Sequence, residues 1–162
     1  LDKNNANPNE YSQICSIIYN LLNDKKWANE ILLKVATKET NLLNMVLYSY
    51  QFKTYDNETS SDEYLEKAVK LCANADDCFQ LSNRMISLGF SLNSTIDFYK
   101  KAFNGLKSSI DKIKWLEGIV DIFNDLKWAK QSYNEMSNQF NSIADKELYI
   151  ISKQHKLENK YW

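Results

Sequence analysis

The sequence predicts an all-α protein built as an array of antiparallel helix pairs. It has only three glycines and one proline in 162 residues. Because turns and sheets use both residue types, this scarcity favours an almost entirely helical chain. Four segments also align at a fixed spacing. They are WANEILLKV (27–35), SSDEYLEKA (60–68), STIDFYKKA (94–102) and WAKQSYNEM (128–136), and their starts lie 33, 34 and 34 residues apart. A constant period of this length indicates one supersecondary unit copied along the chain.

The aligned segments are predicted to form the second helix of each pair. Small or apolar residues recur in them with spacings of four and then three, which places them on one stripe facing a neighbouring helix. A small first residue allows two helix axes to approach closely, and the larger residue four positions later fills the space beyond the crossing. The four stripes are Ala28, Leu32, Val35; Ser61, Leu65, Ala68; Thr95, Tyr99, Ala102; and Ala129, Tyr133, Met136.

Polar residues ahead of these stripes predict where the second helices begin. Asp24 and Asp125 precede the two copies that start with tryptophan and are expected to be N-caps. Ser60 with Glu63, and Ser94 with Asp97, have the spacing of capping boxes. The second helices are therefore expected near 26–37, 60–72, 94–106 and 127–139.

A second periodic stretch lies upstream of each stripe and is predicted to form the first helix of the pair. The expected ranges are 10–22, 40–53, 76–88 and 109–123, with one more helix near 142–158. Trp27 and Trp128 occupy equivalent repeat positions, so both are expected to pack against the first helix of their own unit. Trp115, on a first helix, is expected in the core.

The repeat pattern also predicts the domain organisation. Residues 1–9 form a polar N-terminal extension, and residues 10–162 form one repeat domain with units at 10–39, 40–74, 75–107, 108–141 and a partial unit at 142–162. Trp162 stands 34 residues after Trp128, where a fifth second helix is expected to begin. We interpret the 162 residues as a piece of a longer array. Its apolar C-terminal end then favours self-association.

The 34-residue helix-turn-helix period resembles the tetratricopeptide repeat. Ala28-x3-Leu32-x2-Val35 and Thr95-x3-Tyr99-x2-Ala102 fit the second-helix pattern of that family. The family's usual leucine–glycine or leucine–alanine pair in the first helix is replaced here, and its frequent proline after the second helix is absent. Among helical-repeat families, the Sel1-like repeat is the next most similar to this pattern. The resemblance implies a right-handed α-solenoid of about 4.5 units whose first helices line a concave groove.

Charge and composition disfavour several kinds of partner. The net charge is −1, and Arg84 is the single arginine, so the chain lacks the basic face that nucleic-acid binding needs. No apolar run approaches the roughly 18 residues of a membrane helix. Cys15, Cys72 and Cys78 are an odd number, which argues against a disulfide framework. Cys72 and Cys78 flank a predicted turn and could meet across it, although two half-buried free thiols are favoured. A cytoplasmic location is slightly favoured.

The sequence predicts no catalytic, cofactor or metal site, and an enzyme is not expected. His155 is the one histidine, and no nucleophile or orienting acid pairs with it in the sequence. The three glycines stand far apart and form no phosphate loop. Two neighbouring thiols without a nearby histidine do not complete a zinc site.

A non-catalytic protein-interaction scaffold is therefore the predicted function, with a peptide or partner domain in the groove. The alternative is an accessory domain of a larger enzyme. Arg84 and Lys114 lie on adjacent units and could hold a carboxylate. Val46 and Gly118 are placed on the same face. The predicted partner-binding residues are Gln13, Asn20, Tyr50, Lys53, Gln80, Arg84, Lys114 and Asp121.

Overall fold

The computed structural model describes residues 8–158, and within this range helices are joined by short turns, without a strand. Every helix starts within two residues of its predicted start. The first helix, α1, begins at Pro8, two residues before its predicted start. The predicted fifth second helix at Trp162 lies outside the described residues. The helices are α1 (Pro8–Leu22), α2 (Lys25–Ala36), α3 (Leu42–Thr54), α4 (Glu58–Leu71), α5 (Ala75–Leu88), α6 (Leu92–Ala102), α7 (Ser109–Phe123), α8 (Leu126–Met136) and α9 (Ile143–Leu157). Single 3₁₀ turns follow α6 and α8 at Phe103–Gly105 and Ser137–Gln139.

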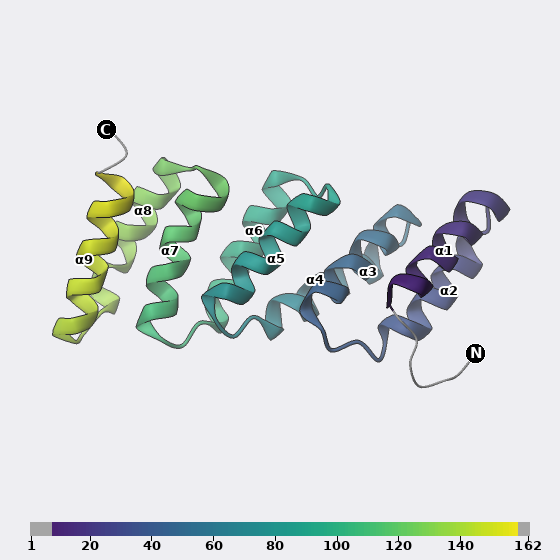
Figure 1. Cartoon of the computed structure of the whole chain (residues 1–162), viewed down its shortest axis with the longest axis horizontal. Coiled ribbons are helices and arrows are strands. Elements are labelled where there is room, and N and C mark those ends of the chain that lie inside the picture. Colours follow the sequence, from purple (N-terminus) through teal and green to yellow (C-terminus); the bar gives the residue numbers. More distant parts are fainter. Residues whose placement is uncertain (1–7, 159–162) are drawn as a thin grey trace.

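The helices lie in two rows (Figure 1). Helices α1, α3, α5, α7 and α9 form one row, here called the odd row, in which each helix packs against the next. Helices α2, α4, α6 and α8 lie behind it and form the even row, and each packs on its partner in the odd row. None of the helices in residues 8–158 is long and apolar enough to cross a bilayer.

Side-chain caps define the helix starts, and two of the predicted caps were wrong. Asp24 and Asp125 accept hydrogen bonds from the backbone N–H groups of Trp27 and Trp128, both at 2.9 Å, as predicted. Ser60 and Ser94 are not caps. Asn57 and Ser91, three residues earlier, cap α4 and α6 by accepting from the N–H groups of those two serines. Each cap therefore lies three residues before the predicted one, and each of the two helices begins two residues before its predicted cap.

The predicted stripes of the second helices are buried at the helix crossings. Eleven of the twelve stripe residues are buried, and Val35 is partly buried. Between α3 and α4 the hydroxyl oxygens of Ser49 and Ser61 are 3.0 Å apart, with both residues almost fully buried. Because two small side chains are in contact, the helix axes cross closely there. This is what the small first residue of each stripe predicts.

Gly118 permits a similarly close approach between α5 and α7. A Cβ atom at this position would lie 2.2 Å from Cε1 of Phe79 and 2.2 Å from the hydroxyl oxygen of Tyr99. Both rings therefore use the space that any other side chain would fill. Gly118 was predicted to face the groove, and Val46 with it, but both are buried in the structure. The packing of the first helices against each other, which the sequence pattern does not reveal, explains this error.

Reciprocal bonds join the third and fourth helix pairs. The Tyr99 hydroxyl donates to the backbone oxygen of Trp115 at 2.9 Å, and the Trp115 indole N–H donates to the backbone oxygen of Tyr99 at 3.0 Å. One repeat later, the Tyr149 hydroxyl donates in the same way to the backbone oxygen of Tyr133. An aromatic residue of each of these first helices is thus tied to the middle of the preceding second helix.

Aspartates near the starts of two first helices make a second link between units. Asp111 accepts a hydrogen bond from the backbone N–H of Ala75 at 3.1 Å, and Asp145 accepts one from the Ser109 hydroxyl at 2.9 Å. Each bond runs from the start of one odd helix to the start of the odd helix before it. Hydrogen bonds from the Ser108 hydroxyl and from the Ala75 N–H, together with the charge of Lys114, lower the pKa of Asp111.

We expect Gly118→Ala to destabilise the protein. Alanine improves helix propensity by about 1 kcal/mol, but the added methyl group must displace the packed rings of Phe79 and Tyr99. Overpacking of a core costs about 1–3 kcal/mol, so the steric term should win. Urea unfolding measures the difference. An unchanged or raised midpoint would show that α5 and α7 do not approach as closely as described.

Asp111→Asn should weaken folding more at neutral than at acidic pH. Because the pKa of Asp111 is lowered in the folded protein, its carboxylate stabilises the fold above its unfolded pKa of about 3.9. That contribution is lost as the pH falls through the folded pKa. The difference in unfolding free energy between wild type and variant should therefore shrink between pH 6 and pH 3, as followed by urea titration. Asp62→Asn, at an exposed position on α4, is the control. A difference independent of pH would contradict the role of the charge.

Candidate partner-binding surface

The predicted partner-binding residues all lie on helices of the odd row, and the structure leaves most of them exposed. Exposed are Gln13 and Asn20 on α1, Lys53 on α3, Gln80 on α5, and Lys114 and Asp121 on α7; Tyr50 on α3 and Arg84 on α5 are half-buried. Because α1, α3, α5 and α7 pack side by side, these residues lie in one row although they are far apart in sequence. None of these eight residues is buried in the hydrophobic core.

Tyr50 and Lys53 are brought together by Phe90, a residue that the sequence analysis missed. The Tyr50 and Phe90 rings meet edge to face at 5.7 Å, and the Lys53 ammonium lies 5.9 Å from the centre of the Phe90 ring. Phe90 follows Gly89, whose φ of 87° ends α5. The Phe90 N–H bonds back to the Met85 oxygen, as in a Schellman motif. A glycine followed by an apolar residue at a helix end was the signal that could have identified Phe90.

Asp121 is already paired within the molecule. Lys156 of α9 places its ammonium 2.6 and 2.8 Å from the two carboxylate oxygens of Asp121, and the lysine side chain is only 17% exposed. A partner that bound Asp121 would have to compete with this ion pair. Of the predicted set, Asp121 is therefore the residue least available to a partner.

Arg84 and Lys114 are the cations of the central odd row that could receive a carboxylate. Neither makes an ion pair within residues 8–158. The Arg84 Nε atom is buried and has no hydrogen-bond partner in that range. A buried donor without an acceptor is costly, so a carboxylate that reached this guanidinium would gain more than a solvent-exposed contact would.

A depression of about 300 Å³ lies on the odd row between α7 and α9. Apolar side chains dominate its lining, with Lys114, Glu117 and His155 among the polar ones. Its lining residues are Ile110, Ile113, Lys114, Glu117, Leu148, Ile151, Ser152 and His155. His155 is exposed at this depression.

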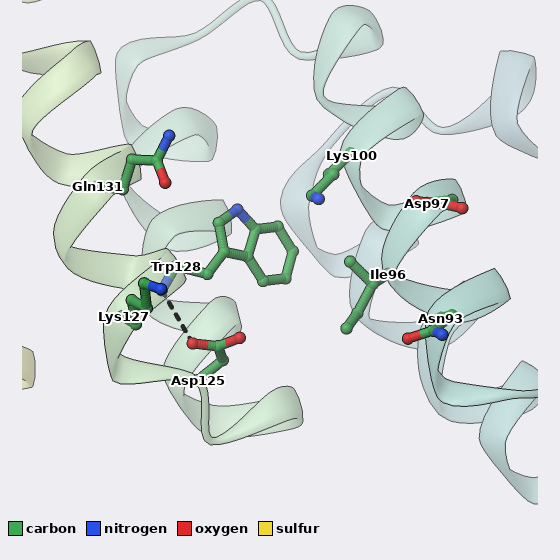
Figure 2. A pocket seen from close by; sticks show the side chains of 8 residues that line it. All are labelled: Asn93, Ile96, Asp97, Lys100, Asp125, Lys127, Trp128 and Gln131. Carbon is green, nitrogen blue, oxygen red and sulfur yellow. Dashed lines mark hydrogen bonds between the residues drawn. The ribbon is translucent and has the colours of Figure 1, made fainter.

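The even row carries a cleft of about 480 Å³ between α6 and α8 (Figure 2). The Trp128 indole reaches from α8 toward α6, with Lys100 and Ile96 on the facing wall. The Lys100 ammonium lies 5.1 Å from the ring centre, so the protein's own lysine makes a cation–π contact with this indole. The charged residues of the lining are two lysines and two aspartates, which favour neither sign of ligand.

The tryptophans differ in the way they pack. Trp115 is buried, as expected. Trp128 packs against Trp115 of its own first helix, with ring centres 5.9 Å apart, and also against Tyr99 of the preceding unit at 6.1 Å. Trp27 was expected to be equally well packed, but it is 47% exposed. In the described chain no helix pair precedes α1 and α2, so Trp27 lacks the contacts that the preceding unit gives to Trp128.

The three cysteines are buried free thiols, whereas Cys72 and Cys78 were expected to be half-buried. Burial raises the pKa of Cys15 to about 11. Cys72 and Cys78 do meet across their turn. Hydrogen bonding with the Cys78 thiol and burial both raise the pKa of Cys72. Cys15 and Cys72 are therefore protonated at neutral pH, and all three cysteines are buried core residues. Within residues 8–158 no three His, Cys, Asp or Glu side chains gather in a way that could hold a metal ion.

Comparisons of this sequence with protein-family models, with curated proteins and with solved structures gave no match.

Proposed function

We propose that this chain is a non-catalytic protein-interaction scaffold that holds a peptide or partner domain on its odd row. The proposal includes the architecture expected from the repeat period: a right-handed α-solenoid of about 4.5 tetratricopeptide-like units. In such an array the helices of one row form a long, continuous surface. The function is then carried by that surface rather than by a single catalytic pocket.

The observation that carries the proposal is the unbroken packing of α1, α3, α5, α7 and α9 along one row. This packing aligns exposed amide and charged side chains from successive helices, with the half-buried Tyr50 among them. Extended arrays of this kind bind partners along one face because every unit presents equivalent positions. The mixed polarity of the odd row suits a peptide, whose backbone needs hydrogen bonds and whose side chains need apolar contacts.

Cations on the central odd row suggest that the partner contributes at least one carboxylate. Lys114 is exposed and Arg84 half-buried, and neither has an ion-pair partner in the described chain. A guanidinium can bind a carboxylate through two parallel hydrogen bonds. We therefore include an acidic side chain or a peptide C-terminus among the partner's features.

The test is a selection of peptides from a random phage-displayed library against the purified chain. Binding of the selected peptides should weaken by at least about tenfold on Lys114→Glu, because a buried or half-buried carboxylate would then face a like charge. Arg84→Gln should weaken binding without introducing a new charge. Both effects should diminish as salt is raised, since exposed charges are screened over about 10 Å at 0.1 M ionic strength. Fluorescence polarisation gives the affinities.

Lys127→Glu is the matched control, because Lys127 is also an exposed lysine but lines the even-row cleft. Its affinity for the selected peptides should stay within about twofold of wild type. The proposal fails if peptides bind both odd-row variants as well as wild type, or if Lys127→Glu alone abolishes binding. Failure of the library to yield any peptide would also count against it.

A further inference from the structure

Two residues that line the depression between α7 and α9 differ from their counterparts one repeat earlier. At the preceding junction, between α5 and α7, the Phe79 ring packs directly against Gly118. The residues 34 positions later are Ile113 and Ser152, and both are buried at the depression. No aromatic ring therefore takes, between α7 and α9, the place that the Phe79 ring takes between α5 and α7.

The rim of the depression carries three exposed apolar residues at positions where the preceding repeat has charged ones. Ile110, Leu148 and Ile151 are 55%, 45% and 62% exposed. The residues one repeat earlier are Asp76, Lys114 and Glu117. Scattered exposed apolar residues need no explanation, but three that replace charged residues around one depression indicate a surface that another molecule covers.

The two edges of the depression have the spacing of helix-facing stripes. Its lining comes from Ile110, Ile113, Lys114 and Glu117 on α7 and from Leu148, Ile151, Ser152 and His155 on α9. Each set follows the pattern i, i+3, i+4, i+7, so each edge runs for about 10.5 Å, or two helical turns. Two neighbouring helices with such edges form a groove that accepts a third helix, whose own i, i+4 and i+7 side chains enter it.

Charges on one edge determine which way such a helix would lie. Lys114 and Glu117 stand almost one turn apart on α7, and neither makes an ion pair in the described chain. A bound helix is most favourable with an acidic residue opposite Lys114 and a basic residue opposite Glu117. In the opposite direction both pairs would carry like charges, which are unfavourable at an interface.

We infer that the depression between α7 and α9 binds an amphipathic helix of a partner protein. Aliphatic side chains of that helix at i, i+4 and i+7 enter the depression, and an acidic and a basic residue flank them. This inference rests on the proposed function, since it names the kind of partner for one part of the odd row. It replaces a general peptide by a helix with a defined pattern of apolar and charged residues.

The test uses a phage-displayed library of short helical peptides in which the positions i, i+3, i+4 and i+7 and their charged neighbours are varied. We expect selected peptides to carry large aliphatic residues at i, i+4 and i+7 and to become helical on binding, as followed by circular dichroism. Ile151→Glu should weaken their binding by at least about tenfold, because it places a charge against apolar side chains.

Ile150→Glu is the matched control. Ile150 is the adjacent residue of α9 and is 51% exposed, but it does not line the depression. Its affinity should remain within about twofold of wild type, and both variants should keep the wild-type circular dichroism spectrum. An affinity unchanged by Ile151→Glu overturns the inference, and so does a library that yields no binder.

The outcomes separate this inference from the proposed function. If peptides lose affinity for Arg84→Gln or Lys114→Glu but not for Ile151→Glu, the helix-binding site is rejected. The proposal that the odd row is a binding surface is then retained. If the wild type self-associates in sedimentation, if Ile151→Glu abolishes that association, and if no peptide competes with it, the occupant is a second copy of the chain. That result also overturns the inference.

Discussion

Tyr99 of α6 and Trp115 of α7 join two helix pairs through both their rings and their backbones. The rings stack with centres 5.1 Å apart and planes 11° apart, while each side chain donates a hydrogen bond to the backbone of the other residue. Trp128 and Phe123 pack at the edges of the same Tyr99 ring. Together with the packing of Phe79 on Gly118 between α5 and α7, this junction holds α7 in its place in the odd row.

Much of the fold could be predicted because each helix pair repeats one local pattern. The period located the helices, and the stripes identified the buried crossing residues. The caps at Ser60 and Ser94 were wrong because Asn57 and Ser91 are equally good capping residues one turn earlier, and local sequence does not rank them. Trp27 was placed in the core by analogy with Trp128. Burial at this position, however, needs contacts from a preceding helix pair, such as those that Tyr99 gives to Trp128. The sequence of one repeat does not show whether such a pair is present.

The candidate surface was only partly predictable, because exposure is local but pairing is not. Exposed residues of the first helices follow from helical periodicity. The pairing of Asp121 with Lys156 joins residues 35 positions apart, and the contact of Lys53 with Phe90 depends on how α5 ends. Ile113 of α7 and Ser152 of α9 belong to the depression. Either residue alone is unremarkable in a helix, and only the packing of α7 against α9 shows that both line one depression.

The two rows differ in how many of the side chains that could bind a partner already have partners within the protein. In the even-row cleft, the Trp128 ring is covered by the Lys100 ammonium, and its backbone N–H is bonded to Asp125. A ligand there would have to displace contacts that the protein already makes. At the odd-row depression, Leu148 and Ile151 remain open to solvent, and Lys114 and Glu117 have no ion-pair partners within residues 8–158. Binding gains most where water is the only competitor. For this physical reason the odd row, and not the larger even-row cleft, is the more favourable surface for a partner.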